Sequence, residues 1–332
     1  MLKSLLKLLA FVLLCFILVE QSYRFYAAGP VAFNPVKFNR LNQLLLTDMV
    51  EASEYPDVYY QLRPNLREWF RGASLNTNSH GLPDQEYELT KPDGVFRIAI
   101  VGSSWTMATG VEPEESYHSI VEQMFADQFP DRRIEIVNFG VEMYGLREIV
   151  GTLRHRVLAW QPDMVIAAYT TYTPYLLWED NPVRPPLPEK TNPFFQSYAA
   201  RALDFKFGTG IFPLSIDERP GIGSDSELYR AQIIRSIVEI GEIVNEQGIP
   251  GMLIWLSFAP ANPVLETRMM GEAGNYGLRY IPAYEYIVGK QSIMVDRQVA
   301  RMDKHPSVES HTLIAQGLFR ELRDSKLISG VE

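Results

Sequence analysis

The sequence is poor in cysteine, and this limits the kinds of site that the chain can hold. Its 332 residues include a single cysteine, Cys15, which excludes an intramolecular disulfide framework and any zinc site built on cysteine pairs. Basic residues are also in deficit, because 31 lysines and arginines stand against 40 aspartates and glutamates, for a net charge of -9. Nucleic-acid-binding surfaces are normally basic, so no nucleic-acid partner is expected.

Long apolar runs are missing from most of the chain, and the exception lies at the N-terminus. Residues 8–19 are continuously apolar, and the leucines before Lys7 bring the run near the roughly 20 residues that cross a bilayer. The small residues that a signal peptidase needs come late, at 27–29. We therefore expect residues 1–28 to form an uncleaved single-pass membrane anchor, with a cleaved signal sequence and a secreted protein as the alternative. Lys3 and Lys7 favour a cytoplasmic N-terminus and an extracytoplasmic domain.

Beyond residue 95, the hydrophobic pattern alternates between strands and helices. Apolar runs predict strands at 96–101, 133–137, 164–169, 251–256 and 280–282, and helical spacing predicts helices at 115–129, 146–160, 226–247 and 309–322. Such alternation predicts a three-layer α/β/α sandwich with a parallel, flavodoxin-like sheet. We assign this domain to residues 96–332, with an N-terminal extension at 29–95 and a proline-rich insert at about 170–224.

Polar residues and glycines follow the predicted strands, at the edge where ligands bind in parallel sheets. The candidates are Gly102-Ser103-Ser104 after the first strand, Asn138 and Gly140 after the second, Tyr172 after the third, and Asp303 and His305 before the last helix. A serine hydroxyl is a weak nucleophile that needs an adjacent imidazole, and the imidazole needs a carboxylate to orient it. The pattern shows neither a metal-ligand cluster nor a phosphate-binding loop, so no metal and no cofactor are expected.

These blocks resemble those of the SGNH, or GDSL-type, hydrolase family over roughly residues 96–323. The resemblance implies that Ser104 is the nucleophile, His305 the general base and Asp303 the acid that orients it. It also implies an oxyanion hole formed by the backbone N–H groups of Ser104 and Gly140.

The chain departs from the family pattern in two blocks. Ser103 replaces the aspartate of the first block, and Tyr172 or Thr171 stands where the third block has an asparagine that completes the oxyanion hole. Losing one oxyanion-hole donor lowers the rate by roughly 100-fold to 1000-fold, and Tyr172 or a threonine hydroxyl is the candidate replacement. Trp105 and Tyr144, beside the first two blocks, are candidate substrate-binding residues.

The resemblance implies a membrane-anchored, extracytoplasmic serine esterase or O-acyltransferase. Residues 60–65 and 76–82 resemble the lead-in of membrane-anchored bacterial hydrolases of this superfamily, many of them associated with polysaccharide assembly. The implied substrate is an O-acetyl ester on a cell-surface or exported polysaccharide, and polysaccharide-assembly proteins are candidate partners. Two alternatives remain open: a catalytically inactive carbohydrate-binding or assembly protein, and a lipid-directed lysophospholipase or thioesterase.

Overall fold

The computed structural model describes residues 2–35, 49–170, 197, 226–287, 298–300 and 303–328. The helices are α1 (Leu2–Ala28), η1 (Gly29–Phe33), α4 (Ser104–Met107), η2 (Pro113–Glu115), α5 (Tyr117–Gln128), α6 (Leu146–His155), η3 (Val157–Trp160), α8 (Glu227–Glu246), α9 (Pro263–Asn275), α10 (Tyr284–Ile287) and α11 (Val308–Asp324). The strands are β1 (Val50–Ala52), β2 (Tyr60–Leu62), β3 (Arg67–Phe70), β4 (Ala73–Asn76), β5 (Val95–Gly102), β6 (Arg133–Gly140), β7 (Met164–Thr170), β8 (Gly251–Leu256), β9 (Arg279–Pro282), β10 (Gln298–Ala300) and β11 (Asp303–Pro306). Most of the predicted insert lies outside the described residues.

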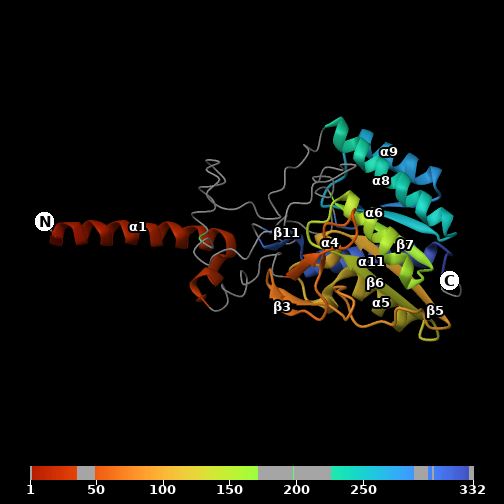
Figure 1. The fold of residues 1–332 in the computed structure, drawn as a ribbon, viewed down its shortest axis with the longest axis horizontal. Helices are drawn as coiled ribbons and strands as arrows, with labels where there is room; N and C mark the ends of the chain where they lie inside the picture. Colours follow the sequence, from red (N-terminus) through yellow and green to blue (C-terminus); the bar gives the residue numbers. More distant parts are fainter. Residues whose placement is uncertain are drawn as a thin grey trace.

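A parallel sheet forms the centre of the described domain (Figure 1). Its strands lie in the order β6-β5-β7-β8-β9 and pair in parallel throughout. This is the flavodoxin-like order, since the first strand of the sheet lies between the second and the third. The predicted three-layer sandwich is therefore confirmed, including the short strand at β9.

Alternate residues of each strand face two separate hydrophobic layers. On β5, Ala99 and Val101 pack in one layer with α6, α8 and α9, whereas Ile98 and Ile100 pack in the other with α5 and α11. This alternation follows from the two-residue repeat of a strand. Both faces of the sheet are covered, which explains why the strands read as nearly continuous apolar runs.

The single helix predicted over 146–160 is divided in two. α6 ends at His155, and η3 follows it as a separate short 3-10 helix. Arg156 between them has φ -115°, and Gln161 closes η3 in the left-handed region at φ 54°. The apolar spacing continues across this break, because Leu153, Val157 and Trp160 are all buried, and periodicity therefore did not reveal it.

Residues 49–82 of the predicted N-terminal extension pack into the same hydrophobic layer as α6 and α8. Tyr60 on β2 donates a hydrogen bond to the Glu142 carbonyl, and the Tyr144 hydroxyl donates one to the Tyr60 carbonyl, both at 2.6 Å. These contacts join the extension to the loop that follows β6. The extension therefore lies against the carboxyl edge of the sheet.

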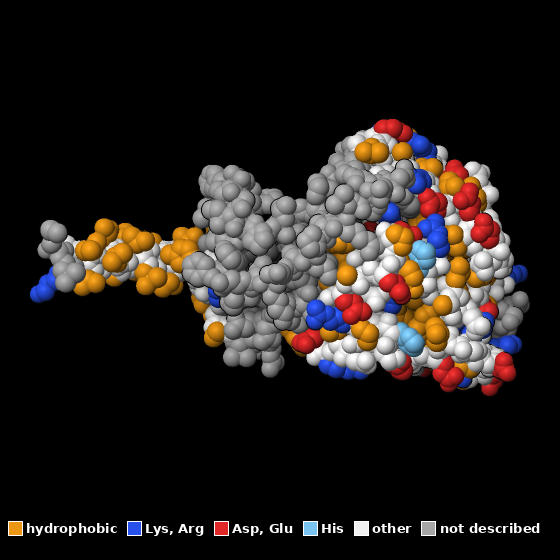
Figure 2. All heavy atoms as spheres, viewed as in Figure 1, with side chains coloured by type: hydrophobic (Ala, Val, Ile, Leu, Met, Phe, Trp, Pro, Cys, Tyr) orange, Lys and Arg blue, Asp and Glu red, His pale blue; other side chains and the backbone are white. Residues whose placement is uncertain are grey.

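The N-terminal helix α1 extends away from the domain (Figure 1). The span Lys3–Tyr26 has a mean hydropathy of 2.1 and is long enough to cross a membrane. Apolar side chains cover its visible surface (Figure 2), and residues such as Phe11 and Leu13 are about 60% exposed. A helix that is apolar on all sides is suited to lipid rather than to water.

Candidate active site

Ser104 lies where β5 passes into α4, at the carboxyl edge of the sheet. β5 ends at Gly102, and Ser104 is the first residue of α4. Ser103 between them has φ -99° and ψ -153°, and its carbonyl accepts hydrogen bonds from the N–H groups of Thr106 and Met107 at 2.9 Å. The chain turns sharply here and places Ser104 at the edge where parallel sheets bind ligands.

The side chain of Ser103 does not hold this turn. It is 4% exposed, and its hydroxyl has no hydrogen-bond partner among the described residues. The backbone carbonyl of Ser103 holds the turn instead. The Ser103→Ala substitution therefore removes a hydroxyl without removing a hydrogen bond, and it can serve as the control for a substitution of Ser104.

Gly140 ends β6 directly beside Ser104's helix. A Cβ atom at Gly140 would lie 2.3 Å from the Met107 nitrogen and 2.6 Å from the Thr106 carbonyl carbon, so only glycine lets β6 and α4 approach this closely. The Gly140 N–H donates to Asn138 Oδ1 at 2.8 Å, and Asn138 Nδ2 donates to the Thr106 carbonyl at 2.8 Å. The expected oxyanion-hole donor is thus already engaged in this conformation, and Asn138 must release it before it can bind an oxyanion.

We expect the Gly140→Ala substitution to lower the free energy of unfolding by about 3 kcal/mol, because the added methyl meets backbone atoms that cannot rotate away. The matched control is Gly271→Ala in α9, where a Cβ has nothing within 4 Å; this change should stabilise by about 0.5 to 1 kcal/mol. Urea unfolding of the full-length protein in detergent measures both. A Gly140→Ala variant as stable as the wild type would contradict this packing.

His305 lies on β11, and β11 contacts α4. β11 pairs with β10 in a separate antiparallel ribbon. The His305 side chain is 13% exposed. Of Asp303, at the start of β11, the structure describes the backbone, and its carboxylate lies outside the described part. The fold therefore brings the helix of Ser104 and the strand of His305 together from distant parts of the sequence.

Glu142 is a carboxylate beside His305 that the sequence reasoning missed. Its Oε2 lies 3.8 Å from His305 Nε2, and its side chain is 2% exposed. Thr109 Oγ1 donates to the same oxygen at 2.5 Å, and Arg71 Nη2 lies 3.6 Å from Oε1. The available signal was an acidic residue two positions after a parallel strand, at the same edge as Ser104.

Trp105 and Tyr144, the candidate substrate-binding residues, are both buried. Trp105 is 4% exposed, and its ring lies 4.7 Å from that of Phe258 in the layer of α5 and α11. Tyr144 is 1% exposed, and burial raises the pKa of its hydroxyl to about 12. Both side chains belong to the hydrophobic layers of the domain, and their part in substrate binding stays a prediction. Tyr172 and Thr171 lie outside the described residues.

Two further histidines, His118 on α5 and His311 on α11, are buried near the site. Burial lowers the pKa of each to about 3, so both are neutral at ordinary pH. His311 Nδ1 accepts a hydrogen bond from the Tyr117 N–H at 3.1 Å, and His118 lies 3.4 Å from the Asn138 amide. They join α5 to its neighbours.

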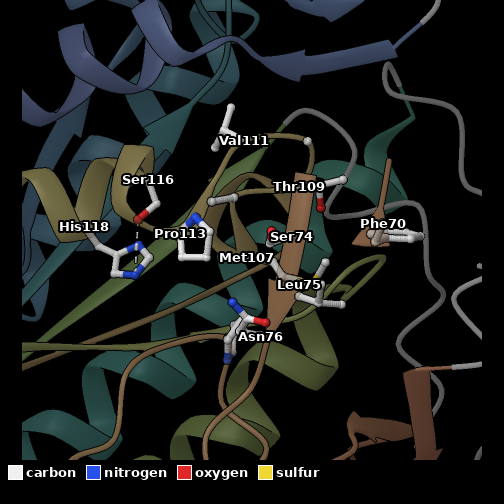
Figure 3. Close-up of a pocket in the computed structure, with 13 residues that line it drawn as sticks. Phe70, Ser74, Leu75, Asn76, Met107, Thr109, Val111, Pro113, Ser116 and His118 are labelled. Atoms are coloured by element: carbon white, nitrogen blue, oxygen red, sulfur yellow. Dashed lines mark hydrogen bonds between the residues drawn. The ribbon is translucent and has the colours of Figure 1, made fainter. Parts of the chain in front are cut away.

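A pocket opens beside His118, between β4 and the loop after α4 (Figure 3). Its lining residues are Phe70, Ser74, Leu75, Asn76, Pro83, Met107, Ala108, Thr109, Gly110, Val111, Pro113, Ser116 and His118. The enclosed space accommodates roughly one water molecule. It includes neither Ser104 nor His305 and is too small for a sugar ring. Within the described ranges, no three His, Cys, Asp or Glu side chains are grouped to bind a metal.

Comparison with known proteins shows a likeness in structure and none in sequence. No protein-family model and no curated protein matches the chain. Its fold is similar to that of an acetylxylan esterase from Geobacillus stearothermophilus, with 15% identity and a TM-score of 0.41 over 68% of this chain and 94% of that one. It is also similar to that of TesA, with 12% identity and a TM-score of 0.46 over 70% of this chain and 99% of that one. A two-domain esterase active on acetylated mannans has 17% identity and a TM-score of 0.44 over 71% of this chain and 50% of that one. These likenesses concern the fold.

Proposed function

We propose that the protein is an SGNH-type serine esterase or O-acyltransferase that acts on O-acetyl groups of a cell-surface or exported polysaccharide. One observation carries the proposal: α4, which begins with Ser104, contacts β11, which holds His305. A nucleophile and its base must lie within reach of each other. The choice of substrate rests on the sequence resemblance to membrane-anchored hydrolases.

The proposed reaction proceeds through an acyl-enzyme. Ser104 Oγ forms a bond to the acetyl carbonyl carbon while its proton passes to His305. The sugar oxygen then leaves and takes that proton back. Water or a second sugar hydroxyl then attacks the acyl carbon and gives its proton to His305, which Asp303 orients. The bond from Ser104 Oγ to the acyl carbon breaks, and Ser104 Oγ takes the proton from His305. Hydrolysis and transfer share the first half of this cycle.

We propose that α1 is an uncleaved anchor and that the domain lies on the extracytoplasmic side of the membrane. The length and apolar surface of Lys3–Tyr26 support this proposal, and Lys3 and Lys7 supply the charge that stays in the cytoplasm. Such an anchor holds the enzyme where exported polysaccharide passes.

The second candidate is a non-catalytic carbohydrate-binding or assembly protein of the same fold, and the Gly140 hydrogen bond favours it. The Gly140 N–H is bound by Asn138 Oδ1, so an oxyanion hole that needs this N–H is closed in this conformation. A protein that only binds a glycan does not require it.

To separate the candidates, the full-length protein in detergent is given acetylated xylan, acetylated glucomannan and p-nitrophenyl esters of acetate and octanoate. The proposal predicts acetate release from a glycan and a preference for acetyl over octanoyl esters of at least about tenfold. A steep preference for octanoate would favour a lipid-directed enzyme instead. Glycan binding without turnover of any ester would favour the non-catalytic protein, and addition of an unacetylated acceptor distinguishes transfer from hydrolysis.

A further inference from the structure

Glu142 lies at the same sheet edge as Ser104, in the loop between β6 and α6. β5 and β6 are paired in register, with Gly102 opposite Gly140. Ser104 and Glu142 are each two residues beyond these paired glycines. Adjacent parallel strands thus carry the serine and the glutamate to equivalent places, and neither position depends on a long flexible loop.

The Glu142 side chain is held in one place by neighbours on both sides. Its carboxylate accepts the Thr109 hydroxyl at 2.5 Å and lies 3.6 Å from Arg71 Nη2. The backbone of Glu142 is fixed as well. Its N–H donates a hydrogen bond to the Met107 sulfur, and its carbonyl accepts one from the Tyr60 hydroxyl. A carboxylate fastened this way can orient a neighbour without first being ordered itself.

The distance from Glu142 Oε2 to His305 Nε2 is 3.8 Å, which is ion-pair range rather than hydrogen-bond range. A negative charge this close favours the protonated imidazole over the neutral one. The effect is strengthened by burial, because solvent screens a pair with 13% and 2% exposed side chains only weakly. His305 becomes positively charged at the moment when it takes a proton from a serine.

We propose that Glu142 is a positioning residue for His305, whose carboxylate holds the imidazole at the site and stabilises its protonated form. The inference deepens the proposed function and rests on it, because it adds a second carboxylate to the set formed by Ser104, His305 and Asp303. Glu142 does not contact the substrate in this role. Its contribution is made through the histidine.

Three other groups bear on this pair. Arg71 faces Glu142 from the turn after β3 and balances part of its charge. Asp303 comes from the same strand as His305. His311 faces His305 from α11 and stays neutral, because burial, helped by the charges of His118 and His305, lowers its pKa to about 3. A substitution at Glu142 therefore removes the charge next to His305 and also the charge that Arg71 faces, whereas His311 keeps its hydrogen bond with the Tyr117 N–H.

The test compares Glu142→Gln, Glu142→Asp and Glu148→Gln with the wild type in the full-length protein in detergent. Glu148 is the matched control, since it is also buried but bonds the Gly145 N–H, where a glutamine oxygen still serves. One readout is the His305 pKa from NMR of histidine-labelled protein, with the signal assigned by His305→Gln. The other is the rate of Ser104 labelling by a fluorophosphonate as a function of pH.

In Glu142→Gln we expect the His305 pKa to fall by about 1 unit or more. The rise of labelling with pH should move to lower pH by the same amount, and its plateau should fall at least about tenfold, because the base is weaker. Glu142→Asp should be intermediate and Glu148→Gln unchanged. A folded Glu142→Gln protein with the wild-type His305 pKa would overturn the inference. A shifted pKa in a protein that never labels would support the pairing and refute the proposed enzyme.

Discussion

Replacing Ser104 with alanine is expected to lower ester turnover by on the order of 10⁴-fold or more, because the acyl-enzyme can no longer form. The fold should persist, since Ser104 is the first residue of α4 and the turn is held by the Ser103 carbonyl. Turnover of p-nitrophenyl acetate by full-length protein in detergent measures the loss, and circular dichroism checks the fold.

The matched control is Ser103→Ala, one residue away. Its hydroxyl is buried and has no hydrogen-bond partner within the described residues, so its removal should leave turnover within about threefold of the wild type. Equal losses in the two variants would indicate damage to the turn rather than loss of a nucleophile. Full activity in Ser104→Ala would end the proposed mechanism.

The largest expected loss of stability comes from Arg97 on β5. Its side chain is fully buried and donates to Glu135 from Nε and Nη2 at 2.9 and 2.7 Å. It also donates to the carbonyls of Glu88, Leu89 and Trp160. Replacing Arg97 with methionine leaves a buried carboxylate without this partner, which costs about 3 to 5 kcal/mol of unfolding free energy. Urea unfolding of the full-length protein measures the cost.

Arg133→Met is the control for this experiment. Arg133 Nη2 lies 3.5 Å from the other oxygen of Glu135, but its side chain is 65% exposed, so its loss should cost about 1 kcal/mol or less. The double variant Arg97→Met with Glu135→Leu should recover part of the stability, because no buried charge then remains. The hydrogen bonds of Arg97 to the Glu88 and Leu89 carbonyls indicate that it links the extension to the sheet. A loss of unfolding free energy in Arg97→Met no larger than in Arg133→Met would contradict this.

The sheet could be predicted because β5, β6, β7 and β8 are buried on both faces and therefore read as apolar runs. Hydrophobic periodicity did not predict α9, and it predicted α6 and η3 as one helix. α9 carries both start signals, with Asn262 accepting a hydrogen bond from the Val264 N–H and Pro263 at its first position. Its buried residues Leu265, Met269 and Ala273 recur every four positions, but the exposed apolar residues Val264 and Met270 obscure this stripe in the sequence.

The candidate site was predictable in part, for a physical reason. Motif order points to Ser104, Gly140 and His305. The positions of Ser104 and Gly140 follow from the ends of the paired strands β5 and β6, whereas His305 lies on a separate ribbon. Glu142 carries no motif, and its approach to His305 depends on how β11 packs against α4. The engagement of Gly140 by Asn138 likewise depends on a side-chain rotamer, which no spacing in the sequence records.

The central claim is that Ser104 is a nucleophile activated by His305. Its most direct test is labelling of the full-length protein with a fluorophosphonate, followed by peptide mass spectrometry to locate the adduct. The account predicts an adduct on Ser104 that is absent in Ser104→Ala and formed far more slowly in His305→Ala. A well-folded protein that carries no adduct, or carries it on another serine, would contradict the account.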